Sequence, residues 1–262
     1  MNWNIKSFVA ATAAVVAMSS ANAGVVKVWG ESPFGVSLQG ISDFYDDLPV
    51  HTSSVASGQL DTVNLTGVNL LWAVQPSDAY TVAELNVMAN FLAGGGRIAF
   101  MGEHGSIAPN ENVRINSALT FLGSTIQIQN TIVDGGFRTA SVLDGQILAH
   151  PLTTGVNTYQ YAAFAPLLLS GSAEALMLGE APNTVMMAYQ NIGPGSIFLI
   201  TDQNVFDNAP TWSGSFDNAR MFENLLSGNT GAPPVNGVPE PAGALLFGLA
   251  LLSVAASRRH RA

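Results

Sequence analysis

Two acidic residues and a histidine are the strongest candidates for chemistry in this sequence. Glu103 and His104 follow one short apolar run directly, and Asp202 follows a second. Open α/β sheets place ligand sites beyond the carboxyl ends of such strands. If the two strands are neighbours, Glu103 and Asp202 converge at one sheet edge. There they and His104 are candidate general acids and bases or metal ligands.

The same three residues also have a structural interpretation. Acidic side chains at strand ends commonly cap loops or helix N-termini, and a loop histidine is commonly solvated. We favour this interpretation for Glu103, His104 and Asp202, because a single sequence does not show convergence.

Several other kinds of site are excluded or disfavoured. The chain has no cysteine, which excludes disulfides, thiolate metal sites and a cysteine nucleophile. It has no G-x-S-x-G, H-E-x-x-H or P-loop motif. The glycines at 94–96 follow a predicted helix and precede a strand, the reverse of a dinucleotide-binding turn. We therefore expect neither a cofactor nor a metal ion.

Two further groups of residues have weaker functional interpretations. The segment 202–208 alternates oxygen-bearing side chains, but it lacks the glycine and the final glutamate of an EF-hand loop. Trp29, Trp72 and Trp212 are able to stack on sugars, although the first two lie in strand-like runs that favour the core.

The elements that must position these residues alternate along the middle of the chain. Strands are predicted at 25–29, 69–74, 98–101 and 195–201, one more in 125–133 and two in 173–189. Helices are predicted at 34–48, 82–92, 111–122 and 218–226. A capping box of Thr81 and Glu84 begins the second helix, and glycines end it. This alternation predicts an α/β fold with a mainly parallel sheet in three layers.

The first 23 residues are typical of a secretory signal peptide. Lys6 precedes an apolar stretch at 8–18, and Ala21 and Ala23 supply small residues at −3 and −1 for cleavage before Gly24.

The last 25 residues contain three parts in a fixed order. Pro239, Glu240 and Pro241 precede sixteen uncharged residues at 242–257, and Arg258, Arg259 and Arg261 form a basic end. This arrangement resembles the PEP-CTERM sorting signal of Gram-negative bacteria. The resemblance implies recognition and removal of the tail by an exosortase in the inner membrane, with the arginines as a membrane stop. An ordinary tail anchor is the alternative.

The predicted organisation is a signal peptide at 1–23, a domain at 24–228, a linker at 229–237 and a sorting signal at 238–262. Five basic and eighteen acidic residues lie between Gly24 and Pro241, a net charge of −13. This acidity disfavours binding to nucleic acid.

The domain also resembles non-catalytic members of the class I glutamine amidotransferase-like fold. The resemblance covers residues 60–227 and rests on NLLWAVQPSDAYTVAELNVMANFLAGGGRIAFMGE, HPLTTGV, SGSAEAL, GSIFLITDQNVFDN and ARMFENLL. Enzymes of that superfamily use a cysteine at a strand-to-helix turn, near the place of residues 102–106 here. Without cysteine no amidotransferase activity carries over, and the resemblance implies only a flavodoxin-like sheet. The apolar run at 242–257 separately predicts a single C-terminal hydrophobic helix.

These features together predict an exported protein that is transiently anchored in the membrane and then reaches the cell surface or the extracellular matrix. Its domain is expected to bind rather than catalyse, with exopolysaccharide as the expected partner. The alternatives are an extracellular hydrolase that uses Glu103, His104 or Asp202, and a structural partner of another envelope protein.

Overall fold

A computed structural model describes residues 23–31, 36–207 and 215–226, and they form a mixed α/β fold around a mostly parallel sheet. The predicted signal peptide up to residue 22, the linker and the sorting signal lie outside these residues, as does Trp212. No helix among the described residues is long and apolar enough to cross a bilayer.

The central sheet has seven strands in the order β2-β1-β3-β4-β11-β10-β9. Only β10 runs against the other six, because it pairs antiparallel with both of its neighbours. The strands of this sheet are β1 (Val25–Gly30), β2 (Thr52–Val55), β3 (Leu70–Val74), β4 (Arg97–Met101), β9 (Glu174–Leu178), β10 (Val185–Ile192) and β11 (Gly195–Ile200).

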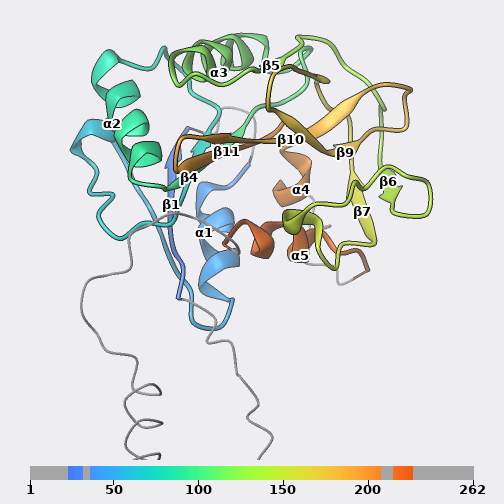
Figure 1. Ribbon diagram of the computed structural model, residues 1–262, viewed down its shortest axis with the longest axis horizontal. Helices are drawn as coiled ribbons and strands as arrows, with labels where there is room; N and C mark the ends of the chain where they lie inside the picture. The colour runs from blue at the N-terminus through green and yellow to red at the C-terminus, as the bar shows by residue number, and fades with distance from the viewer. Residues whose placement is uncertain (1–22, 32–35, 208–214, 227–262) are drawn as a thin grey trace, which may run out of the picture.

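Helices cover both faces of this sheet. Figure 1 shows α2 and α3 on one side of it and α1, α4 and α5 on the other. The core accordingly has two parts, one around Trp72 and Phe222 and one around Phe100 and Leu119. The helices are α1 (Leu38–Asp46), α2 (Val82–Ala93), α3 (Pro109–Phe121), α4 (Asn204–Asp207) and α5 (Asn218–Glu223).

The local signals in the sequence place most of these elements correctly. Thr81 caps α2 as expected, since its hydroxyl accepts a hydrogen bond from Glu84 N and the Glu84 carboxylate accepts one from Thr81 N. The helix expected at 34–48 begins at Leu38 instead, because the Ser37 hydroxyl accepts from Gly40 N and caps the helix there. The helix expected at 111–122 begins two residues earlier, with Pro109 in its first turn.

The segment 125–133 differs most from its expected role. Only β5 (Ile126–Ile128) is a strand, and it pairs with β8 (Leu167–Leu169) in a separate two-stranded sheet. A second small sheet joins β6 (Arg138–Ser141) to β7 (Thr158–Tyr161). Three short 3-10 helices complete the described elements: η1 (Leu60–Thr62), η2 (Pro151–Thr153) and η3 (Asn224–Leu226).

Candidate functional site

The carboxyl ends of β3, β4 and β11 meet at one edge of the sheet because these strands are parallel neighbours. Gln75 follows β3, Glu103 follows β4 with one residue between, and Asp202 follows β11 in the same way. Backbone hydrogen bonds continue past the strands, from Gln75 N to Met101 O at 3.1 Å and from Gly102 N to Ile200 O at 2.9 Å. The structure therefore brings two of the candidate carboxyl groups to the same edge.

Glu103 is buried and held by backbone donors. Its side chain is 1% exposed, and its two oxygens accept hydrogen bonds from His104 N at 2.7 Å and from Gln203 N at 3.0 Å. Burial and the nearby Asp202 carboxylate raise the pKa of Glu103 to about 8. At neutral pH this carboxyl is mostly protonated.

Asp202 has the same kind of environment. It is fully buried, and its oxygens accept hydrogen bonds from Ala162 N at 2.7 Å and from Asn204 N at 2.9 Å. Burial raises the pKa of Asp202 to about 6, against the lowering effect of these hydrogen bonds. Both carboxyl groups thus fasten loops, as in the structural interpretation of the sequence.

The main chain at Glu103 is fixed as firmly as its side chain. Asn112 in α3 donates to Glu103 O at 2.6 Å and accepts from Glu103 N at 3.2 Å. Asn112 also donates to the Asn130 side chain at 3.0 Å, which links this turn to the next loop. An acid held at so many points is poorly suited to move toward a substrate.

His104 is not solvated, contrary to the structural interpretation of the sequence. It is only 8% exposed. The next residue, Gly105, lies so close to the backbone of Asn130 that a Cβ there would be 2.3 Å from the Asn130 carbonyl carbon. The imidazole Nδ1 is 2.7 Å from the Ser106 hydroxyl, and Nε2 is 3.8 Å from Glu103 Oε1. Burial lowers the pKa of His104, so the ring is neutral at pH 7.

Gln75 shows strain and an unsatisfied group at this edge. It has a positive φ of 31°, which is unusual for a residue other than glycine. Its amide nitrogen donates to Gln203 Oε1 at 2.9 Å, but its own Oε1 is buried and has no hydrogen-bond partner in the described part of the chain. A strained residue of this kind persists only where the surrounding structure holds it in place, and such residues cluster at functional sites.

A cavity of about 400 Å³ lies at the carboxyl ends of β1 and β3, and Pro76, the residue after Gln75, is part of its lining. Along the chain, β2 is added to the sheet on one side of β1 and β3 on the other side, so the strand order reverses here. Open α/β sheets bind ligands at such a reversal. Trp29, Glu31, Asp78 and Tyr80 are among its lining residues. The site analysis of the sequence missed the last three, although Asp78 and Tyr80 follow an apolar run as Glu103 does.

The Trp29 and Tyr80 rings form the aromatic part of this cavity. Their centroids are 5.8 Å apart and the rings are tilted by 33°. The Trp29 indole nitrogen donates to Gly58 O at 2.8 Å, which holds the largely buried ring in place. Trp72, in contrast, is fully buried in the core and donates to the Tyr45 hydroxyl at 3.1 Å.

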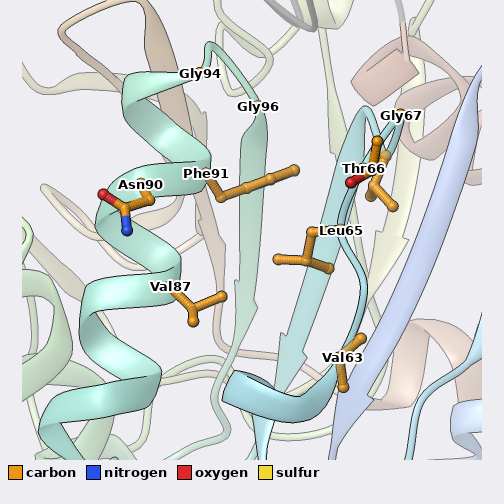
Figure 2. Close-up of a pocket in the computed structure, with 10 residues that line it drawn as sticks. Val63, Leu65, Thr66, Gly67, Val87, Asn90, Phe91, Gly94 and Gly96 are labelled. Carbon is orange, nitrogen blue, oxygen red and sulfur yellow. The ribbon is translucent and has the colours of Figure 1, made fainter.

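A second cavity of similar size lies at the opposite end of the sheet (Figure 2). It is a mainly apolar groove between α2 and the loop before β3, with Val63, Leu65, Val87 and Phe91 on its walls. Neither Glu103 nor Asp202 lines this groove or the β1–β3 cavity.

The described residues hold no group of three or more histidines and carboxylates placed to bind a metal ion. In the segment 202–208, Asp202 is already committed to the backbone of Ala162 and Asn204. The residues Ala21, Pro239, Glu240, Pro241, Arg258, Arg259 and Arg261 lie outside the described part of the chain, and Ala23 is its first residue.

No family model and no curated protein matches this sequence. Among solved structures, the mmIFT52 N-terminal domain is 19% identical with a TM-score of 0.58, over 79% of this chain and 98% of that one. A cytoplasmic protein from Salmonella typhimurium LT2 is 12% identical, with a TM-score of 0.57 over 77% and 98%. A putative ThuA-like protein from Parabacteroides merdae is 8% identical, with a TM-score of 0.57 over 83% and 93%. Identities this low establish a shared fold alone.

Proposed function

We propose that this chain is an exported, exosortase-sorted surface or matrix protein whose α/β domain is a non-catalytic binding module. The observation that carries the sorting part is the order of Pro239–Glu240–Pro241, an uncharged apolar run and terminal arginines, behind a predicted signal peptide. The observation that supports binding rather than catalysis is the double use of Glu103 and Asp202 as buried acceptors of backbone hydrogen bonds.

The proposed architecture is flavodoxin-like. The strand order β2-β1-β3-β4-β11 has the 2-1-3-4-5 pattern of doubly wound sheets, with helices on both faces. The antiparallel β10 and the further strand β9 extend this pattern at one edge. The β1–β3 cavity then occupies the place where such sheets hold ligands, which makes it the proposed binding site.

The hydrolase alternative finds little support in this geometry. A general acid or base must reach the reacting atom within hydrogen-bond distance, directly or through one water. Glu103 and Asp202 are both about 1% exposed or less and accept two backbone hydrogen bonds each. Turnover on panels of glycans and esters that disappears in Glu103→Gln would reverse this conclusion.

Fractionation of cells that make the native protein tests the sorting proposal. We expect the intact mass of the form outside the inner membrane to lack residues 1–23 and the tail 242–262. A full-length tail in the inner membrane would instead indicate an ordinary anchored periplasmic domain. Co-sedimentation of the exported form with the exopolysaccharide of the same cells tests the binding proposal, and its absence would count against a matrix role.

A further inference from the structure

We propose that the β1–β3 cavity binds an amino sugar, with the protonated amine of the sugar at Asp78 and Glu31 and its ring against Tyr80 and Trp29. The inference rests on the proposed binding function and names the class of ligand for the same site. It is carried by the charge, the unused polar groups and the aromatic wall of the cavity.

The charge of the cavity is negative. Three acidic residues line it, Glu31, Asp78 and Glu84, and no basic residue is among the described lining residues. The Arg114 guanidinium contacts the wall from outside the lining, where it donates to Pro76 O at 2.9 Å and lies 3.4 Å from the Glu111 carboxylate. A uronic acid or a phosphate would therefore meet repulsion here, whereas a cation is attracted.

The N-terminus of α2 does not offset this charge, although helix N-termini attract anions. Two of its donors are used by the capping box, because Thr81 Oγ1 accepts from Glu84 N and Glu84 Oε2 accepts from Thr81 N, and the Glu84 carboxylate places a negative charge in this first turn. Glu84 Oε1 also accepts from Leu60 N at 3.2 Å. The helix end thus presents a capped, acidic surface instead of an anion site.

The three carboxylates differ in how many hydrogen bonds they already accept from the protein. Glu84 accepts three protein hydrogen bonds and holds the wall of the cavity together. Glu31 accepts one, from Ser77 N at 3.0 Å to Oε2. Asp78 is exposed and accepts none from the described residues. A ligand amine with three N–H donors finds its free acceptors at Asp78 and Glu31.

The aromatic wall adds a preference for a ring that is both apolar and polar. The tilted rings of Trp29 and Tyr80 provide apolar surface, on which the C–H face of a sugar packs. The Tyr80 hydroxyl is closed off from the cavity, so Tyr80 contributes its ring and not its phenol to the wall. Sugar hydroxyl groups both donate and accept hydrogen bonds, so they match the polar side chains of Ser57 and Gln59 in the lining.

The test compares glucosamine, glucose and glucuronic acid as probes, with the exported protein purified from the cells that make it. Ligand-observed NMR titration should give the tightest binding for glucosamine, weaker binding for glucose and none for glucuronic acid. Asp78→Asn should weaken glucosamine binding about threefold to fivefold, the usual loss for an ion pair at an exposed residue. Tyr80→Leu should weaken it severalfold, because it removes the aromatic face of Tyr80 from the wall of the cavity.

Asp47→Asn is the matched control, since it makes the same charge change at an exposed residue that does not line the cavity. It should leave the affinity for glucosamine unchanged. Equal binding of glucosamine and glucuronic acid, no binding of glucosamine, or an unaltered affinity in Asp78→Asn would each overturn the assignment. If the protein still co-sediments with the exopolysaccharide in that case, only this assignment fails. If it does not, the proposed binding function fails as well.

Discussion

Glu103 holds a proton at neutral pH because its carboxyl is buried beside that of Asp202. In the unfolded chain the group ionises near 4.5, whereas in the folded domain its pKa is about 8. Between these values only the folded state binds the proton, so the fold loses stability as the pH rises through this window. Asp202, with a pKa near 6, acts in the same direction at lower pH.

We therefore expect the free energy of unfolding to fall between pH 7 and pH 8 by about 1 kcal/mol, since one proton contributes about 1.4 kcal/mol per pH unit. The lowered pKa values of His104 and His150 act below their unfolded value of 6.5, where they reduce stability as the pH falls. Above pH 7 the pH dependence of stability therefore comes from Glu103. Urea unfolding at a series of pH values measures this dependence.

Glu103→Gln should remove the pH dependence between 7 and 8, at the cost of some stability because its amide group meets a backbone N–H. Asp61→Asn, at an exposed position, is the control that should keep the dependence of the original protein. A dependence that survives in Glu103→Gln would show that another group binds the proton.

At the scale of elements, α2 depends on its capping box more than on helix propensity alone. Thr81 and Glu84 satisfy donors at the start of the helix, and Glu84 also ties it to η1 through Leu60 N. Thr81→Ala should destabilise the fold by about 1 kcal/mol in chemical denaturation. Thr120→Ala, at an exposed position near the end of α3, should change stability by less than about 0.5 kcal/mol. Equal effects of the two changes would contradict the capping role.

The contact between β1 and β3 depends on Gly30 in a different way. Its φ is 128°, and a Cβ added there would lie 2.1 Å from Val74 O. Gly30→Ala should therefore force β1 and β3 apart at the cavity, with a loss of about 3 kcal/mol or more. Gly193→Ala has positive φ but no atom near the added Cβ, so it should cost only about 1 kcal/mol. Thermal unfolding of the two variants separates backbone strain from collision.

Elements with strong local signals were predictable, and those stabilised by their neighbours were not. β3, β4 and β11 are buried along their whole length, and each contains an uninterrupted apolar run in the sequence, at 70–74, 98–101 and 197–200. β2 has the sequence TSSV and is mostly exposed, so no hydrophobic pattern marks it. It exists because β1 supplies a parallel partner along its whole length. The same reason applies to β6 and β7, which pair with each other and not with the central sheet.

At the scale of the whole molecule, the arrangement of the strands decides which residues meet. β4 and β11 are neighbours although about a hundred residues separate them, and no local pattern encodes that pairing. The sequence therefore predicts that Glu103 and Asp202 lie close together only if these two strands are neighbours. The sequence did not reveal the β1–β3 cavity, for a related reason. Glu31, Asp78 and Tyr80 belong to separate loops, which form one wall only after β1 and β3 pair.

The proposed export route gives the last prediction, which concerns the chain as a whole. The described domain would be carried to the membrane by residues outside it, and Pro239, Glu240 and Pro241 would mark where the tail is recognised. Replacing these three residues by alanine should leave the apolar run and the arginines intact, so the protein should still insert. It should then keep its tail and accumulate in the inner membrane fraction, as intact mass and fractionation will show.

The matched control replaces Pro233 and Pro234 in the predicted linker by alanine. This change removes two prolines upstream of the recognised tripeptide without touching it, so the tail should still be removed. Equal processing of both variants would mean that the tripeptide is not what the exosortase reads. Retention of both would mean that an extended segment before the membrane is needed, since each proline restricts its own backbone and that of the residue before it. The location of this domain depends on the sorting tripeptide only if the variant of Pro239, Glu240 and Pro241 keeps its tail while the control variant loses it.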